Sequence, residues 1–183
     1  VTTKNSGMLA SPANRIHSMD HDVCTCGELF AGGFSGWTQA LRRLEAMNFK
    51  IDHRFALECD AECVMFFSKS HDFKHVFGPE DFSCLHDDLP THVLLHADVK
   101  IGGWMHLIGC HAYDFLMMSP PCPPWSMATS AQGLMKEDGR LTLVSFGLCN
   151  LIRPKVLLFE NVAAMKSHDQ WSFLRDMLHW CGY

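Results

Sequence analysis

Basic residues are scarce relative to acidic ones in this chain. Its 183 residues include 15 Lys and Arg against 20 Asp and Glu, which gives a formal net charge of −5. Domains that bind nucleic acid unaided usually present a basic face. The charge balance therefore gives no support for a polyanion as the partner of this segment on its own.

Long apolar runs, internal repeats and low-complexity tracts are also missing. No stretch approaches the roughly 20 apolar residues that a membrane-spanning helix needs, and no basic-then-apolar signal peptide opens the chain. We therefore expect an intracellular protein that does not associate with membranes. With 48% hydrophobic and 11% aromatic residues, the composition is typical of one globular domain with a substantial core.

Nine cysteines are present, but their pattern does not indicate a disulfide framework. The number is odd, and several cysteines, such as Cys110, Cys149 and Cys181, lie in apolar segments. This usage is typical of reduced thiols inside a cell.

The chain divides into a polar leader and one patterned domain. Residues 1–22 lack periodicity, which predicts a flexible leader. Residues 23–183 alternate between short apolar runs and helical patterns: strands are expected at 23–30, 55–57, 93–97, 113–118 and 156–159, and helices at 38–47, 61–68, 141–152 and 171–180. Such alternation predicts an α/β fold with a mostly parallel sheet and helices on both faces.

Distinctive residues follow the strands, where parallel sheets bind their ligands. A glycine-rich turn over residues 30–36 follows the first strand and indicates either a cofactor loop or an ordinary tight turn. Glu58 follows the second strand, where a carboxylate can accept both hydroxyls of a ribose or simply favour a helix N-terminus. Asp98 follows the third and is open to the same two interpretations, plus turn formation.

One cysteine is framed by proline pairs in the segment Ser119-Pro120-Pro121-Cys122-Pro123-Pro124-Trp125-Ser126. Each proline fixes its own φ and disfavours helical geometry in the residue before it. The backbone around Cys122 therefore loses little conformational freedom when a substrate binds. We interpret Cys122 as a nucleophile rather than an inert buried thiol. Glu160 ends a later apolar run, where a carboxylate must be paired, exposed or share a proton; the alternative is a solvated acid beside a helix cap by Asn161.

These motifs together resemble the cytosine carbon-5 methyltransferase family, which uses S-adenosylmethionine. The resemblance covers about residues 23–183 and rests on Phe30-Ala31-Gly32 with Gly36, Glu58, Asp98, Pro120-Pro121-Cys122 with Pro124 and Ser126, Arg140, and Glu160-Asn161-Val162. It implies a Rossmann-like methyltransferase fold and DNA as substrate and partner. The location it implies is nuclear in a eukaryote and cytoplasmic in a bacterium.

The resemblance also implies roles for individual residues. The cysteine at the position of Cys122 attacks carbon 6 of the cytosine ring, and the glutamate at Glu160 hydrogen-bonds ring nitrogen 3 and the amino group. The target base must leave the stack to reach them. By the same resemblance, S-adenosylmethionine contacts Phe30, Ala31, Gly32, Gly33, Gly36, Glu58, Asp98 and Pro120. The base contacts Pro121, Ser126, Asn161 and Val162.

Some positions depart from the family pattern. The glycine loop is one residue short, Glu28 replaces an aspartate, Pro123 a glutamine, Trp125 a phenylalanine or tyrosine, and Ala163 a proline. The chain also ends at Tyr183, before the family's Gln-x-Arg-x-Arg strand, its target-recognition region and its last helix. We therefore expect an incomplete catalytic domain, truncated on its C-terminal side, whose strand at 156–159 is an exposed edge that lowers solubility.

Three alternatives remain open from the sequence. Cys59, Cys63, His71 and His75 suggest a zinc module, although seven residues separate the pairs against about twelve in a finger. An RNA cytosine methyltransferase would carry the same catalytic residues. A non-catalytic homologue would act only as a binding module. The oligomeric state is not determined by the sequence.

Overall fold

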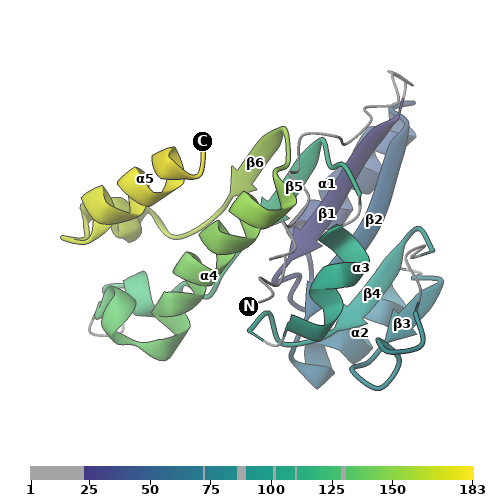
Figure 1. The fold of residues 1–183 in the computed structure, drawn as a ribbon, viewed down its shortest axis with the longest axis horizontal. Coiled ribbons are helices and arrows are strands. Elements are labelled where there is room, and N and C mark those ends of the chain that lie inside the picture. Colours follow the sequence, from purple (N-terminus) through teal and green to yellow (C-terminus); the bar gives the residue numbers. More distant parts are fainter. Residues whose placement is uncertain (1–22, 72, 86–89, 101, 110, 129–130) are drawn as a thin grey trace, which may run out of the picture.

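A computed structural model describes residues 23–71, 73–85, 90–100, 102–109, 111–128 and 131–183; the expected leader at 1–22 lies outside this part. Its centre is a six-stranded parallel sheet (Figure 1). The strands are β1 (Cys24–Leu29), β2 (Ile51–Glu58), β3 (His75–Phe77), β4 (Val93–His96), β5 (Phe115–Met118) and β6 (Val156–Phe159). The α-helices are α1 (Gly36–Ala46), α2 (Ala61–His71), α3 (Met105–Gly109), α4 (Glu137–Ile152) and α5 (Trp171–Trp180).

The spatial order of the strands is β3-β4-β2-β1-β5-β6. The pairings align the strand ends: Leu29 lies opposite Leu57 and Met118, and Met118 lies opposite Phe159. The segments that follow these strands therefore emerge at one edge of the sheet. The α/β fold with a parallel sheet, expected from the sequence, is confirmed.

Helices cover both faces of the sheet, also as expected. In Figure 1, α3 and α4 lie in front of the strands, and α1 and α2 lie behind. The larger core packs alternate strand residues against α3 and α4, and contains Leu29, Phe55, Leu57, Val93, Leu95, Leu116, Met118, Leu107, Ile108, Leu148 and Ile152. On the other face, Ala56 and Leu94 pack with Val64 and Phe67 of α2, and Cys26 and Met117 pack with Leu41 of α1.

Strand β2 begins at Ile51, four residues before the expected start at residue 55. The register of β1 and β2 shifts between Cys26, which pairs with His53, and Gly27, which pairs with Phe55. A Cβ on Gly27 would collide with the Phe55 ring, so glycine is needed there. The irregularity interrupts the alternation of polar and apolar residues, which is why the start of β2 was hidden in the sequence.

Two short elements, β3 and α3, were not expected. Strand β3 has three residues, of which His75 and Val76 are exposed, and α3 has five. Neither is long enough to show a clear periodicity. Pairing with β4 and packing of Leu107 into the core stabilise them instead.

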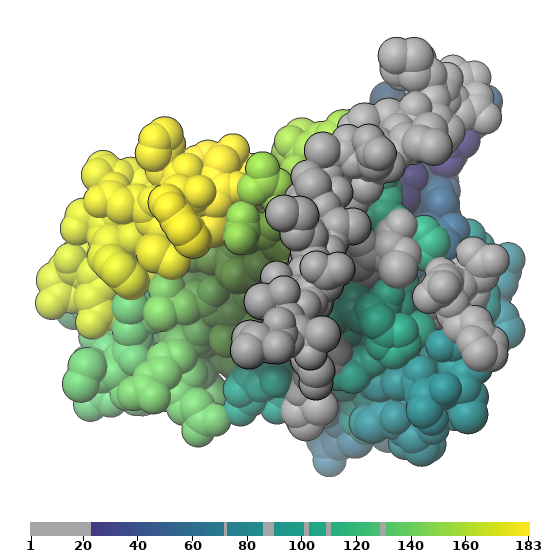
Figure 2. All heavy atoms as spheres, viewed as in Figure 1, coloured from purple at the N-terminus to yellow at the C-terminus, as the bar shows by residue number. Residues whose placement is uncertain are grey.

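A further cluster lies beyond β6, where α5 packs against the loops that follow β5 and β6. It contains Trp125, Phe146, Met165, Leu174 and Cys181. Figure 2 shows this region, green and yellow, gathered at one end of the molecule. The cluster supports the segments that follow β5 and β6.

Strand β6 is an edge strand in the described sheet, because it pairs with β5 alone. Val156 is 41% exposed there, and the other three residues of β6 are partly buried. The sequence prediction of an apolar edge is therefore confirmed, while its effect on solubility stays a prediction.

Candidate active site

Candidate residues from five different loops line the carboxyl edge of the sheet in one spatial order. Across the sheet, β4 is followed by Asp98, β2 ends in Glu58, β1 leads into the glycine loop, β5 into the Cys122 loop, and β6 into Glu160. The main chain ties neighbours together, since the Ala97 amide donates to the Glu58 carbonyl oxygen at 2.9 Å. The fold thus collects on one edge residues that are far apart in the chain, such as Gly32 and Cys122, which follow the neighbouring strands β1 and β5.

The glycine loop turns sharply away from β1. Phe30 has a φ of +60° and Gly32 a φ of +62°, a region that suits glycine and strains phenylalanine. The Ala31 amide donates to the Leu57 carbonyl oxygen at 3.0 Å, and Ala31 is 5% exposed. Gly36 then begins α1, with open space beside its Cα, while Gly33 lies near Phe66 and Cys63.

The carboxylate of Glu58 organises this corner. It accepts the Gly32 amide at 2.7 Å on Oε2, and the amides of Cys59 and Asp60 at 2.8 and 2.9 Å on Oε1. Glu58 is 9% exposed. The glycine loop and the end of β2 are therefore joined through one carboxylate, with lone-pair capacity left for a further donor.

A second carboxylate, Glu28, lies buried beneath the same loop and was not assigned a role from the sequence. It accepts hydrogen bonds from the Ser35 hydroxyl at 2.6 Å and the Thr38 hydroxyl at 2.7 Å. Ser35 in turn caps α1 by accepting the Thr38 amide at 3.0 Å. Burial raises the pKa of Glu28 to about 7, although both hydroxyl hydrogen bonds oppose the shift. The sequence signal was a single acid inside the apolar run of β1.

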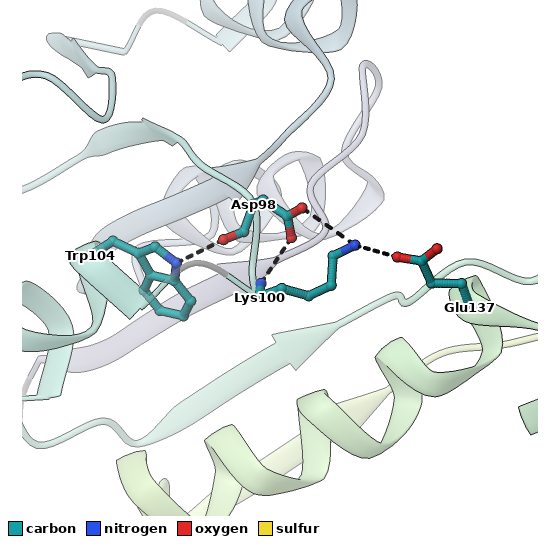
Figure 3. A network of polar contacts seen from close by, with 4 residues as sticks. All are labelled: Asp98, Lys100, Trp104 and Glu137. Atoms are coloured by element: carbon teal, nitrogen blue, oxygen red, sulfur yellow. Dashed lines mark hydrogen bonds and ion pairs between the residues drawn. The ribbon is translucent and has the colours of Figure 1, made fainter.

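Asp98 takes part in a polar network at the end of β4 (Figure 3). Its Oδ1 accepts the Lys100 amide at 2.8 Å, and its carbonyl oxygen accepts the Trp104 indole N–H at 3.1 Å. The Lys100 ammonium bridges to Glu137 of α4 at 2.8 Å and lies 3.6 Å from Asp98 Oδ2. The network holds Asp98 beside the start of α4.

A mostly apolar cavity of about 420 Å³ opens next to Asp98. Its walls include Phe82, Pro79, Ala97, Gly103 and His106. Phe82 is 6% exposed and comes from a segment between β3 and β4 that carried no recognisable motif. The sequence therefore predicted Asp98 at this cavity but not the apolar wall that Phe82 forms.

The Cys122 loop is held in a single tight turn. Cys122 is exposed and has φ −87° and ψ −20°, so the expectation that Pro123 keeps it out of helical geometry is wrong. Cys122 instead begins a 3-10 turn over Pro123–Trp125, in which its carbonyl oxygen accepts the Trp125 amide at 3.0 Å. The Trp125 side chain, which ends this turn, is completely buried.

The loop after β6 contacts the Cys122 loop directly. The Glu160 amide donates to the Met118 carbonyl oxygen at 2.9 Å, and the Asn161 side-chain amide donates to the Pro120 carbonyl oxygen at 3.0 Å. The Glu160 side chain is exposed. Pro120 and Glu160 therefore lie at the ends of adjacent strands, linked by one hydrogen bond between the loops.

The remaining candidates lie around these two loops. Pro121 is partly buried, and the Ser126 hydroxyl accepts the Ala128 amide at 3.2 Å. Val162 packs against the cluster around Trp125, and its amide donates to its neighbour's side chain, Asn161 Oδ1, at 2.9 Å. These contacts give Ser126 and Val162 evident structural roles beside the proposed substrate contacts.

The zinc alternative finds no support in the described residues. No three His, Cys, Asp or Glu side chains within them are grouped closely enough to hold a metal ion. His71 is 5% exposed and its ring packs against Phe67, whereas His75 lies on the exposed strand β3 and stacks on Phe77. The described cysteines are all free thiols.

Comparison with known proteins identifies the family of the chain. A family model described as C-5 cytosine-specific DNA methylase matches residues 24–183. The chain belongs to this family. Among curated relatives, it is 31% identical over 67 residues to the type II methyltransferase M.DsaV of Dactylococcopsis salina, which is 37% of this chain and 19% of that protein.

A second relative of this chain is the type II methyltransferase M.BanI of Aneurinibacillus aneurinilyticus. The identity is 33% over 66 residues, which is 36% of this chain and 15% of the relative. The aligned segments thus span less than a fifth of each relative's length. Among the residues that the structure describes, no helix has the length and hydrophobicity needed to cross a membrane.

Proposed function

We propose that this domain transfers a methyl group from S-adenosylmethionine to carbon 5 of cytosine in DNA, through a covalent bond between Cys122 and the ring. The observation that carries the proposal is the order of groups along the carboxyl edge. Asp98, Glu58 and the glycine loop follow β4, β2 and β1, and the loops of Cys122 and Glu160 follow β5 and β6. A methyl donor bound at the first group of residues would lie next to a base bound between the loops of Cys122 and Glu160.

The chemistry of the residues at Asp98, Glu58 and the glycine loop supports S-adenosylmethionine as the methyl donor; we call this part of the edge its cofactor half. The cavity of about 420 Å³ at Asp98 has Phe82 and Ala97 among its walls, and apolar walls suit a flat adenine ring. Glu58 accepts three backbone N–H groups and, with about four lone-pair positions on a carboxylate, can still accept a ribose hydroxyl. The backbone of the glycine loop around Gly32 would bind the methionine part of the cofactor. Bound there, the cofactor supplies an electrophilic methyl group.

The residues of the other half would activate the cytosine. Cys122, as a thiolate, forms a bond to carbon 6, and the electron pair of the carbon 5–carbon 6 double bond moves toward carbon 5. Glu160, in its protonated form, donates to ring nitrogen 3 and stabilises the charge that develops on the ring. Carbon 5 then accepts the methyl group and gives its proton to a base such as water. The electron pair of that carbon–hydrogen bond restores the double bond, while the carbon–sulfur electron pair leaves with Cys122 as a thiolate.

DNA is the substrate that the comparisons favour. The family model is described as a cytosine-specific DNA methylase, and both relatives are type II methyltransferases. The target base must be extruded from the duplex to reach Cys122, because the reaction needs access to both faces of the ring. Cys122 is exposed, as such access requires.

The test is covalent trapping by the protein that contains this domain. The protein is incubated with S-adenosylmethionine and duplex DNA that carries 5-fluorocytosine, whose fluorine cannot leave as a proton does. We expect a denaturation-resistant protein–DNA complex, mapped by mass spectrometry to Cys122, and none with Cys122→Ala. A structured RNA substrate is run in parallel. Trapping on RNA alone contradicts the DNA assignment, and the absence of any adduct contradicts methyl transfer.

A further inference from the structure

A hydrogen bond joins the cofactor half of the edge to the nucleophile half. The Trp37 indole N–H donates to the Ser119 hydroxyl oxygen at 2.8 Å, across 82 positions of sequence. Trp37 is the second residue of α1, directly after the glycine loop, and Ser119 is the first residue after β5. We propose that Trp37 is a positioning residue that holds the Cys122 loop at a set distance from the glycine loop. The inference rests on the proposed function and extends it.

Trp37 is itself firmly placed. Its neighbours Ser35 and Thr38 both donate to the buried carboxyl of Glu28, at 2.6 and 2.7 Å. Its ring packs against the cluster formed by Cys26, Leu41 and Met117. The indole N–H is therefore held in a fixed position, and its hydrogen bond fixes the position of the Ser119 hydroxyl oxygen.

The connection from Ser119 to the nucleophile is short and stiff. Two residues, Pro120 and Pro121, separate Ser119 from Cys122, and both have a locked φ. The Ser119 amide is only loosely held by the Leu29 carbonyl oxygen, at 3.4 Å. A shift of the Ser119 side chain is consequently transmitted to the sulfur rather than absorbed in the loop.

Two hydrogen bonds thus anchor the Cys122 loop from opposite sides. Asn161 holds the Pro120 carbonyl oxygen from the β6 side, and Trp37 holds Ser119 from the α1 side. Methyl transfer requires the sulfur, the ring and the methyl group to be aligned together, and misplacement by about 1 Å can cost on the order of a hundredfold in rate. Loss of one anchor should lower the rate of the chemical step more than it weakens ligand binding.

The experiment compares Trp37→Phe, which keeps an apolar ring but removes the N–H, with Ser119→Ala, which removes the acceptor. We expect each to lower kcat about tenfold, with the dissociation constant of S-adenosylhomocysteine within about twofold of wild type. The double variant should lose no more than either single variant, because both remove the same bond. Ser119→Thr, which keeps a hydroxyl, should recover most of the rate.

The matched control is Trp180→Phe, the same change at a tryptophan that is 76% exposed on α5; its kcat should equal that of wild type. An unchanged kcat in the Trp37 and Ser119 variants, additive losses in the double variant, or a loss found wholly in cofactor affinity overturns the proposal. Reduced thermal stability with kcat unchanged overturns it as well.

A readout without turnover separates this inference from the proposed function. The alkylation rate of Cys122 by iodoacetamide is measured by mass spectrometry relative to Cys84, which is exposed on the same chain. We expect this ratio to differ at least twofold between wild type and Trp37→Phe, because loss of the Trp37–Ser119 hydrogen bond changes the position of the Cys122 loop. If the ratio is equal in the two proteins, the positioning role is wrong even where methylation is observed. If wild type methylates nothing, the proposed function fails whatever the ratio does.

Discussion

The side-chain amide of Asn161 donates to the carbonyl oxygen of Pro120 at 3.0 Å. Its own oxygen accepts the Val162 amide at 2.9 Å, so both ends of the Asn161 side chain are used. The contact fixes the loop of Glu160 against the loop of Cys122. Cys122 and Glu160, the two groups proposed to act on the pyrimidine ring, therefore lie on loops that are joined by a hydrogen bond.

Replacement of the proposed nucleophile is the most direct test of the proposed chemistry. Cys122→Ala should abolish both turnover and covalent trapping, because no atom remains to bond carbon 6. Cys122→Ser should leave very little turnover, since an alcohol is rarely ionised near neutral pH. Transfer of a radiolabelled methyl group measures both variants. Because Cys122 is exposed, folding should be unaffected, and Cys84→Ala is the control for loss of an exposed thiol.

Glu160→Gln should slow methyl transfer by a factor on the order of a hundred, as expected for loss of a positioned acid. The amide is close in size to the acid and can still hydrogen-bond the ring, so binding of the target base should change less than kcat. Single-turnover kinetics with saturating cofactor measure the effect. A rate within threefold of wild type would exclude Glu160 from the chemical step.

Glu58→Gln should weaken the cofactor site and disturb the glycine loop. Glu58 accepts N–H groups on both oxygens, and an amide would direct an NH₂ group at one of these donors. We expect the dissociation constant of S-adenosylhomocysteine to rise about tenfold or more, which corresponds to the roughly 1–3 kcal/mol cost of an unpaired polar group. Calorimetric titration measures it. The exposed Glu62→Gln on α2 is the control, and equal affinity in both variants contradicts the assignment.

Glu28→Gln should change how stability depends on pH. Burial raises the pKa of Glu28 from 4.5 to about 7, so above pH 4.5 the unfolded chain releases a proton that the folded protein keeps. Stability in wild type therefore falls, through this group, as pH rises from about 4.5 to about 7, by on the order of 3 kcal/mol in total. Glu28→Gln has no titrating carboxyl at this position, so this decrease in stability should be absent from the variant. We measure the free energy of unfolding in urea at pH 5, 6 and 7. At each step up in pH, the stability of Glu28→Gln should increase relative to that of wild type.

His53 acts in the opposite direction and serves as the comparison. Burial, with a smaller contribution from His92, lowers the pKa of His53 from 6.5 to about 3. Its contribution to stability is present above pH 6.5 and is lost as pH falls toward 3. His53→Phe should therefore make the fall in stability between pH 5 and pH 7 steeper than in wild type. If both variants keep the wild-type pH dependence, neither group titrates as described.

Elements with a clear local pattern were predicted closely from the sequence. Strand β6 and helix α5 begin and end at the expected residues, Val156–Phe159 and Trp171–Trp180, because both combine apolar periodicity with clear boundaries. The polar start of β2 and the three-residue β3 were missed. Their conformation comes from pairing with neighbouring strands, which leaves no signal in the local sequence.

The amino-acid sequence by itself determined the loops that we propose carry the chemistry: a cysteine among prolines, an acid after an apolar strand, and a turn that requires glycine at residue 32. These depend on backbone restrictions that neighbouring residues impose on one another. Only the tertiary structure decided how the loops meet, as shown by Trp37 with Ser119, Asn161 with Pro120, and Phe82 beside Asp98. Such contacts depend on strand order and on packing across the sheet, and residues far apart in the chain carry no local mark of the partner they will meet.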